Sequence, residues 1–475
     1  MDVLIYVDIY YNTIYNQCTR RIMITIDWSE EMKLNLGTEK ISKLLWQLSI
    51  PAILGMLSSA IFNIVDRIYV GKLSSYALTA VGITMPIQII QMAFILLIGI
   101  GTSSLISIKL GEDKKEEAED ILYLALKYII LFLIGFAIIF MSFLNSILHL
   151  LAISTEVLPY AKEYIVIIIV GSIIGIPGYC LNNTLRSIGQ AKVSMKIIVI
   201  TSILNIILDP LFIFVLKLGI AGAAIATVIS QTTLTIYVIY VFVKRTDFII
   251  HLKIRKVINE ANLIKESLKM GLPSFYVQIL AAIVNFYINN SLLKYGTDLD
   301  IAAVTIMSSI YSFYHMVIVG IVQGNNSICG YNWGAKQYAR VRKSLELALF
   351  YSFLLSSFLY LVILLYPQLL VNMFTNDQLL IQSTSAGMKF YLSMLPLIGL
   401  QTISSQYFQV VGKVRRSSVL AFLRYGIIII PSILILAPKL GVKGIYISNA
   451  LSDGIASAIA IVYILLEIIK LKRLE

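Results

Sequence analysis

The segment KLGIAG at residues 217–222 returns as KLGVKG at residues 439–444, an offset of 222 positions. The same offset, or one position more, aligns Pro51 with Pro273, Asn63 with Asn285, Gly101 with Gly324, Gly111 with Gly334, Gly189 with Gly412 and Ser230 with Ser452. Apolar residues often match by chance in a chain that is 58% hydrophobic, but glycine and proline match at a fixed offset far more rarely. The sequence therefore predicts two similar halves.

The composition indicates where these halves are buried. Only 13% of the 475 residues are charged and 58% are hydrophobic, whereas a soluble domain has roughly 25% charged and 45 to 50% apolar residues. A single hydrophobic core stops growing near about 250 to 300 residues. An apolar excess spread evenly over this length therefore needs a bilayer around it. These numbers exclude a soluble globular protein and indicate a polytopic helical membrane protein.

Twelve apolar runs are long enough to cross a membrane, which takes about 20 residues. They cover residues 46–70, 78–109, 121–144, 161–183, 193–216, 221–243, 270–293, 301–328, 343–365, 385–408, 416–438 and 443–469. We therefore expect an all-α membrane protein with twelve transmembrane helices in two six-helix bundles. The expected parts are an N-lobe at 37–243, a cytoplasmic linker at 244–269 and a C-lobe at 270–475. Because six is even, both lobes enter the membrane in the same direction, as in a parallel repeat.

Basic residues are distributed unevenly between the two sets of connections. Most of them fall in one set, within residues 114–115, 186–196, 244–269, 336–343 and 413–416. By the positive-inside rule, this bias places both termini in the cytoplasm of a multi-pass plasma-membrane protein. The net charge of +12 is thus interpreted as an orientation signal with contacts to membrane lipids, and we expect no nucleic-acid partner.

Motifs for catalysis and cofactor binding are missing from the sequence. Three cysteines and three histidines are scattered without metal-binding spacing. The patterns HExxH, GxSxG and GxxxxGK[ST] do not occur. We expect neither enzymatic activity nor a cofactor other than a coupling ion.

The first 36 residues differ from the rest of the chain. They mix tyrosines with scattered charges, and they contain no apolar run long enough for a signal peptide. Met32 opens a more regular stretch, MKLNLGTEKISKLLWQ, which resembles a basic amphipathic approach to the first helix. We expect residues 1–36 to be an N-terminal extension rather than a cleaved signal, with Met32 as an alternative start of translation.

Two carboxylates, Asp66 and Asp209, lie within apolar runs of the first half. An ionisable side chain at this depth costs about 2.5 to 3.5 kcal/mol on insertion scales, so it is interpreted as functional by default. Asn205 lies one helical turn before Asp209 and shares its face, and Pro210 removes a backbone donor beside them. We expect this segment to present a polar site inside the membrane.

Tyr164 and Thr227 fall at the same depth when the neighbouring helices are followed from their outer ends. A cluster of carboxylate, amide and hydroxyl oxygens suits a proton or a hard cation, with sodium held by Asn205 and the two carboxylates. The alternative is that the first carboxylate only caps a helix or pairs with Arg67 near the outer interface, and that the second only ends a helix.

The second half lacks these carboxylates at the aligned positions, where Ile288 stands opposite Asp66 and Ile430 opposite Asp209. We therefore expect only the first lobe to titrate and the membrane interior to be short of cations. Neutral polar and aromatic residues are expected to line a roomy amphipathic cavity that could hold an organic cation: Gln278, Asn285, Asn289, Tyr314 and His315. The alternative for each is interhelical packing by hydrogen bonds.

Four segments together resemble one known family. They are NIVDRIYVGKL at 63–73, LNIILDPLFI at 204–213, GIAGAAIAT at 219–227 and QGNNSICGYNWGAK at 323–336. In their order and spacing they resemble the multidrug and toxic compound extrusion (MATE) family, in its DinF-like branch, over residues 37–470. The resemblance implies a V-shaped pair of six-helix bundles that exports amphipathic, often cationic drugs in exchange for protons or sodium.

The resemblance also implies roles for individual residues. The coupling cluster would comprise Asp66, Tyr164, Asn205, Asp209 and Thr227. Pro51 would be the hinge of a bending first helix, and Asn182 would contact the drug. The acid that another branch of the family carries in its second lobe has no counterpart among the neutral asparagines of the seventh helix.

We therefore expect a monomeric secondary antiporter that exports small amphipathic, cationic drugs or toxins in exchange for protons or sodium ions. The alternative is a lipid-linked oligosaccharide flippase of related architecture. Such a flippase needs a cavity rich in arginine and lysine for a pyrophosphate, which the expected shortage of cations argues against.

Overall fold

A computed structural model describes residues 35–151, 153–245 and 248–475, and the regular structure in these ranges is helical. The N-terminal extension expected at 1–36, including the alternative start at Met32, lies outside the described residues except for Asn35 and Leu36.

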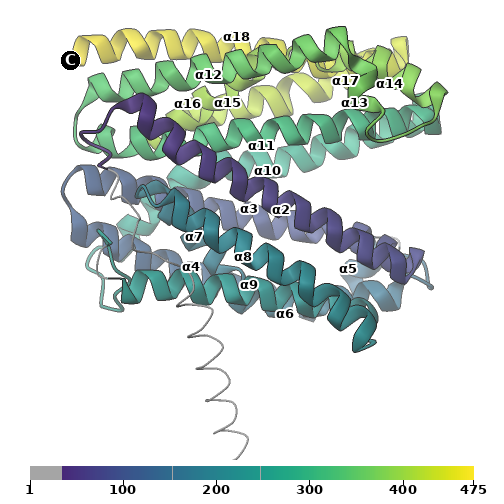
Figure 1. The fold of residues 1–475 in the computed structure, drawn as a ribbon, viewed down its shortest axis with the longest axis horizontal. Coiled ribbons are helices and arrows are strands. Elements are labelled where there is room, and N and C mark those ends of the chain that lie inside the picture. Colours follow the sequence, from purple (N-terminus) through teal and green to yellow (C-terminus); the bar gives the residue numbers. More distant parts are fainter. Residues whose placement is uncertain (1–34, 152, 246–247) are drawn as a thin grey trace, which may run out of the picture. The chain divides into compact units, whose positions relative to one another are not determined.

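The first half is built from long helices interrupted by short breaks (Figure 1). Its elements are α2 (Ile41–Leu73), α3 (Ser75–Gly111), α4 (Lys115–Ser142), α5 (Leu144–Leu150), α6 (Leu158–Gly175), α7 (Pro177–Ser187), α8 (Ala191–Pro210), the π-helix η1 (Leu211–Val215) and α9 (Gly219–Lys244). Ser74 separates the first two, because its extended backbone ends α2 and its side chain accepts a hydrogen bond of 3.0 Å from the backbone N–H of Ala77.

The second half begins with α10, whose first residue is Glu260, so that the last part of the expected linker is helical. Its elements are α10 (Glu260–Tyr295), α11 (Asp298–Gly334), α12 (Tyr338–Leu365), α13 (Pro367–Val371), α14 (Gln378–Tyr391), α15 (Leu395–Val410), α16 (Val414–Phe422), the π-helix η2 (Leu423–Ile428), α17 (Ile429–Leu440) and α18 (Val442–Leu474). Thr297 and Asp300 form a capping box that starts α11.

Eleven helices of the described residues are long and apolar enough to span a membrane. The tenth expected crossing, residues 385–408, is broken because α14 ends at Tyr391 and α15 begins at Leu395, with a proline in its first turn. The fourth crossing is broken in the same way where Pro177 starts α7 after α6. Proline is well tolerated in the first turn of a helix and poorly in its interior, so each proline marks a new helix start.

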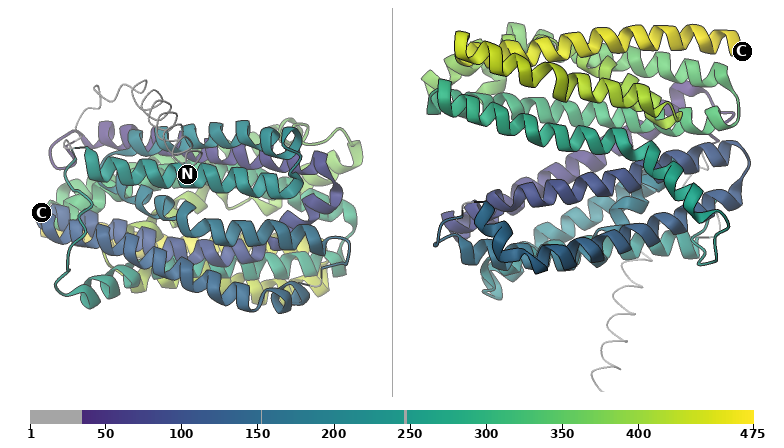
Figure 2. Two further views of the ribbon diagram at one scale, coloured as in Figure 1. Left: turned by 90° about the horizontal axis from the view of Figure 1, so that it is seen from below. Right: turned by 180° about the vertical axis from the view of Figure 1, so that it is seen from behind.

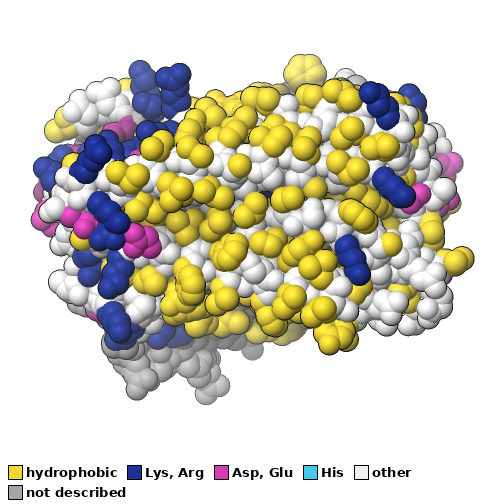
Figure 3. Space-filling view, turned by 90° about the horizontal axis from the view of Figure 1, so that it is seen from above, with side chains coloured by type: hydrophobic (Ala, Val, Ile, Leu, Met, Phe, Trp, Pro, Cys, Tyr) yellow, Lys and Arg dark blue, Asp and Glu magenta, His cyan; other side chains and the backbone are white. Residues whose placement is uncertain are grey.

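Each half forms its own bundle, and α2, α3, α10 and α11 make the main contacts between the two (Figures 1 and 2). Helix α2 packs on α8 of its own half and on α11 of the other half, while α3 packs on α10 and α11. Lys and Arg side chains gather mostly toward one end of the face in Figure 3, and hydrophobic side chains cover its middle. An apolar band with charged ends is the surface that a bilayer requires.

Four of the glycines that align between the halves lie where the two bundles touch, namely Gly101, Gly111, Gly324 and Gly334. A Cβ atom on Gly101 of α3 would overlap the carbonyl oxygen of Ser267 on α10, and one on Gly324 of α11 would overlap the Ser49 side chain of α2. Thus α3 meets α10 as α11 meets α2, which is the pairing expected from a duplicated chain. Small residues at these positions let the helix backbones approach closely, as is typical of membrane helices.

Gly271 of α10 completes this junction and provides a test of it. A Cβ there would overlap the backbone oxygen of Leu97 on α3, so Gly271→Ala should separate α3 from α10 and cost roughly 1 to 3 kcal/mol of unfolding free energy. Denaturant unfolding in detergent measures this loss. Gly135→Ala is the matched control, because a Cβ there meets no atom within 4 Å, and alanine should instead stabilise the helix by up to about 1 kcal/mol. Equal effects of the two substitutions would contradict the close packing.

Candidate functional site

Asn205 and Asp209 form the centre of a polar cluster inside the first bundle. Both lie on α8, one turn apart, and the Nδ2 of Asn205 donates a hydrogen bond of 3.3 Å to Oδ1 of Asp209. Asp209 has no exposed surface and Asn205 only 1%. A carboxylate at this depth, with a single neutral partner among the described residues, is a costly arrangement.

The chain changes its helical pitch directly after Asp209. Pro210 ends α8, and residues 211–215 form the π-helix η1, in which the N–H of Leu216 bonds to the oxygen of Leu211. Proline has no N–H to donate, so the α-helical ladder is interrupted here. Single π-turns within helices are frequently found at functional sites.

Asp66 and Tyr164 face the same cluster from α2 and α6. The carboxyl groups of Asp66 and Asp209 are close enough to repel each other, and both act on the buried hydroxyl of Tyr164. Asp66 is half-buried and makes no ion pair with Arg67 among the described residues. Arg67 is exposed and points a guanidinium nitrogen at the sulfur of Met85 instead.

Three oxygens of the cluster lack a hydrogen-bond partner among the described residues: Oδ1 of Asp66, Oδ1 of Asn205 and Oδ2 of Asp209. Thr227 of α9 shares with Asn205 a small cavity of about 10 Å³, which is also lined by the hydroxyl-bearing residues Thr201, Ser202 and Ser230. A space of this size holds roughly one water molecule. The structure thus brings all five predicted coupling residues to the polar interior of the first bundle.

The next feature is the set of side chains that could ligate a metal ion. No group of three or more His, Cys, Asp or Glu side chains that could hold a metal ion occurs within the part of the chain that the structure describes. Sodium at Asp66, Asn205 and Asp209 would therefore depend on amide and hydroxyl oxygens beside the two carboxylates.

Pro51 lies buried inside α2, between the residues that contact the second bundle. Ser49 packs against Gly324, and Ile53 packs against Gly320. Proline has no backbone N–H, so one hydrogen bond of α2 is missing where α2 packs on α11.

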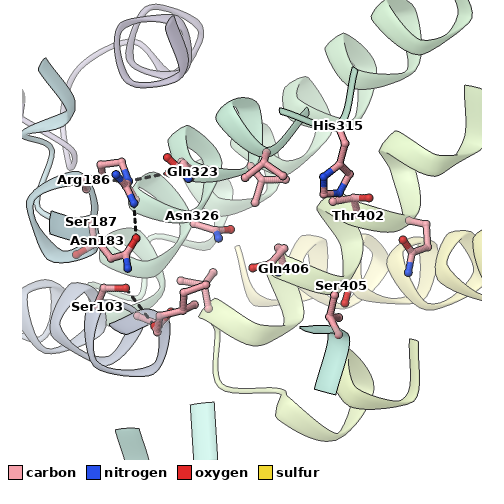
Figure 4. A pocket seen from close by; sticks show the side chains of 18 of the residues that line it. Ser103, Asn183, Arg186, Ser187, His315, Gln323, Asn326, Thr402, Ser405 and Gln406 are labelled. Atoms are coloured by element: carbon pink, nitrogen blue, oxygen red, sulfur yellow. Dashed lines mark hydrogen bonds between the residues drawn. The ribbon is translucent and has the colours of Figure 1, made fainter. Parts of the chain in front are cut away.

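A second site lies at the junction of the bundles, as a cavity of about 170 Å³ (Figure 4). Arg186, Asn183, Ser187 and Ser103 of the first bundle line one side, and residues of α11 and α15, among them Gln323, Asn326, Thr402, Ser405 and Gln406, line the other. The lining also includes His315 and Arg424, but no carboxylate.

The predicted cavity residues are placed in different surroundings. Among them, only His315 lines the cavity described above. The hydroxyl of Tyr314 lies 2.6 Å from Oγ of Ser356 inside the second bundle, and Asn182 is buried in the first. Gln278 is half-buried, and two are exposed along α10, namely Asn285 and Asn289.

The expectation that only the first half carries acids within the membrane is wrong. Asp453 of α18 is buried in the second bundle, and its Oδ1 accepts a hydrogen bond of 2.8 Å from Nε of Arg424. The expected shortage of cations is also wrong, because Arg424 is only 7% exposed. Its Nη2 donates to the hydroxyl of Tyr311 at 2.8 Å, and the ring of Tyr311 stacks on His315.

These two residues carried a signal in the sequence. Arg424 and Asp453 lie within the apolar runs 416–438 and 443–469, where an ionisable residue predicts a function or a partner. Neither residue aligns with an acid of the first half, since Ser202 stands opposite Arg424 and Gln231 opposite Asp453.

Comparisons with known proteins agree with the geometry. A profile of the family described as MatE matches residues 51–211 and 273–435. The multidrug export protein MepA of Staphylococcus saprophyticus is 27% identical over 438 residues, which cover 90% of this chain and 94% of that protein. MepA of Staphylococcus aureus (strain N315) is 26% identical over 89% of this chain and 94% of its own length. A solved outward-facing structure of a multidrug resistance MATE family transporter of the MOP superfamily is 25% identical, with a TM-score of 0.86 over 91% of this chain and 97% of that one.

The buried pair predicts strong energetic coupling. Asp453→Asn leaves the guanidinium of Arg424 without its carboxylate, and Arg424→Gln leaves Asp453 unpaired. Each single substitution should therefore lower the free energy of unfolding by about 3 to 5 kcal/mol. The double variant should lose clearly less than the sum of the two. Denaturant unfolding of all four proteins measures this cycle, and additive losses would show that the two groups do not stabilise each other.

Proposed function

The chain belongs to the MatE family of multidrug and toxic compound extrusion transporters, and from this premise we propose that it is a secondary antiporter that exports amphipathic small molecules in exchange for protons or sodium ions. The observation that carries the proposal is the pair of carboxylates, Asp66 and Asp209, with unpaired buried oxygens in the first bundle. The family match does not favour the lipid-linked oligosaccharide flippase.

The coupling step follows from electrostatics. Two neighbouring carboxylates in a medium of low dielectric constant do not both ionise easily, so an entering proton or sodium ion is stabilised between them. Asn205 and Tyr164 supply an amide and a hydroxyl beside the carboxylates. Binding the ion removes a repulsion between α2 and α8, and it therefore favours closing the first bundle around the ion.

The export step couples this closure to the second bundle through α2. That helix carries Asp66 and also packs on α11 near the proline at position 51. A bend at Pro51 would let the outer part of α2 follow the ion site while its other end stays on α11. Alternating access by rocking of two bundles would then open and reseal the glycine junction between α3 and α10.

Energetics constrain the exchange ratio. Exporting a monovalent cation against about 100 mV costs roughly 2.3 kcal/mol, which is the energy that one entering proton releases. One-for-one exchange of cations is therefore driven only by the concentration gradient of the ion. The two carboxylates leave room for a second ion, and a second ion would add the membrane potential to the driving force.

Further features of the proposal rest on the sequence. The bias of lysine and arginine supports cytoplasmic termini. The neutral polar and aromatic residues of the second half support cationic amphipaths as substrates. We propose that the protein works as a monomer in the plasma membrane.

Asp209→Asn is the direct test of coupling. The amide cannot bind a proton or balance a cation, so efflux of ethidium from proteoliposomes under an imposed pH or sodium gradient should fall to the level of empty liposomes. Detergent-solubilised variant protein should still elute as a single folded species, because the side chain keeps its size.

Glu163→Gln is the matched control for this test. It removes a carboxylate from α6 that is exposed and adjacent to Tyr164, so it should leave efflux unchanged. Uphill ethidium efflux that persists in Asp209→Asn, or that is lost to the same extent in Glu163→Gln, would remove Asp209 from the mechanism.

A further inference from the structure

The cavity at the junction of the bundles has an unbalanced charge. Its lining holds two arginines and no carboxylate. Arg424 is neutralised by Asp453 behind it, at 2.8 Å. Arg186 has no carboxylate partner among the described residues. The cavity therefore carries one guanidinium whose charge is not balanced locally.

Arg186 is held by neutral groups only. One guanidinium nitrogen donates to Oγ of Ser194 at 3.0 Å, and another donates to Oδ1 of Asn183. A guanidinium has five N–H donors, so donors remain for a ligand. The two neutral acceptors also fix the planar group in place, which prepares it for an oxyanion.

Arg186 lies at one side of the cavity, where the two bundles meet. It lies in the last turn of α7, and its backbone oxygen accepts a hydrogen bond of 2.8 Å from Ser327 of α11, in the other bundle. Figure 4 shows Arg186 at one side of the cavity, with Gln323 and Asn326 beside it and Gln406 opposite. A half-buried cation without a charged partner is less favourable than one that a counter-charge balances.

Two acceptors of the same lining are also unsatisfied. Oε1 of Gln323 and Oδ1 of Asn326 are buried without a hydrogen-bond partner among the described residues. Valines supply apolar surface next to them, including Val319 and Val322. The cavity lining thus combines a cation, neutral amide and hydroxyl side chains and an apolar wall, which matches a ligand with an anionic group, hydrogen-bonding groups and an apolar body.

We propose that this cavity contains an oxyanion subsite, in which Arg186 binds the carboxylate of an amphipathic substrate, so that the exported molecules include amphipathic anions and zwitterions. This inference rests on the proposed function and specifies its substrate. Energetics favour it. When an anion leaves and a proton enters, the two movements together transfer a net charge of +2 into the cell. Membrane potential then drives export of an anion, whereas it does not drive one-for-one exchange of a cation.

Binding of matched probes to the full chain in nanodiscs tests the subsite without any ion gradient. The probes are 1-pyrenebutyrate and its neutral amide, which share one apolar body, and their binding is measured by equilibrium dialysis. Wild-type protein should bind the carboxylate at least about tenfold more tightly than the amide, since a charge-assisted bidentate pair forms only with the carboxylate.

Substitutions at the subsite separate ligand binding from a structural role. Arg186→Gln should weaken binding of the carboxylate by about tenfold or more and that of the amide less than about twofold. Arg186→Lys should lie between, because it keeps the charge but loses the planar fork. Asn183→Asp keeps the arginine and gives it an internal carboxylate, so it should also abolish the preference for the carboxylate. Arg415→Gln, at an exposed arginine, is the control and should change neither probe.

Several outcomes would overturn the subsite. The subsite is contradicted if wild-type protein binds the amide as tightly as the carboxylate. It is also contradicted if Arg186→Gln weakens the binding of both probes equally. If Arg186→Gln does not fold, a carboxylate preference that survives in Asn183→Asp would be equally decisive. If the carboxylate probe binds but gradient-driven efflux fails, only the antiport proposal is contradicted. If ethidium efflux depends on Asp209 but the carboxylate probe does not bind, only the subsite is contradicted.

Discussion

A charge inside this bundle must be balanced, because the surrounding bilayer offers it neither water nor counter-ions. Three charge systems of the described chain meet this requirement in different ways. Arg424 and Asp453 balance each other within the second bundle. Asp66 and Asp209 have like charges and oxygens without a hydrogen-bond partner among the described residues, and we propose that an ion balances them. Arg186 has only neutral side-chain partners there, and we propose that a bound anionic group balances it. In this proposal, the paired charges stabilise the fold and the unpaired charges serve transport.

Glycines let the two bundles pack closely where they meet. Gly101 and Gly324 occupy equivalent places in the two halves, and each permits close contact with a helix of the opposite half. Contacts of this kind rely on van der Waals packing and bury few polar groups, so they can separate and re-form without leaving a charge unpaired.

Much of the architecture was predictable from the sequence, and the reasons are physical. The all-α fold, the membrane-spanning helices and the duplication follow from composition and from glycine and proline at a fixed offset, and they are confirmed. The breaks before Leu395 and at Pro177 were not predicted, because a run of apolar residues looks the same whether one helix or two cross the bilayer. Arg424 and Asp453 were visible as ionisable residues within apolar runs, but their pairing could not be predicted because they lie on different helices. Tyr314 and Asn285 were predicted to line one cavity. Which side chains face a cavity depends on how each helix is rotated about its axis. In helices that are apolar all round, the sequence pattern does not determine this rotation.

The π-turn after Pro210 has a consequence for the relation between the two halves. A π-turn accommodates one residue more than an α-turn, and one residue corresponds to about 100° around a helix axis. In the first half this extra residue follows Asp209, whereas in the second half η2 begins at Leu423, ahead of the proline at position 431. The duplicated helices are thus out of phase over the segment between these points. A polar face that one lobe turns toward its interior is turned elsewhere in the other, so a chain that arose by copying itself can carry the Asp66 and Asp209 cluster in a single copy.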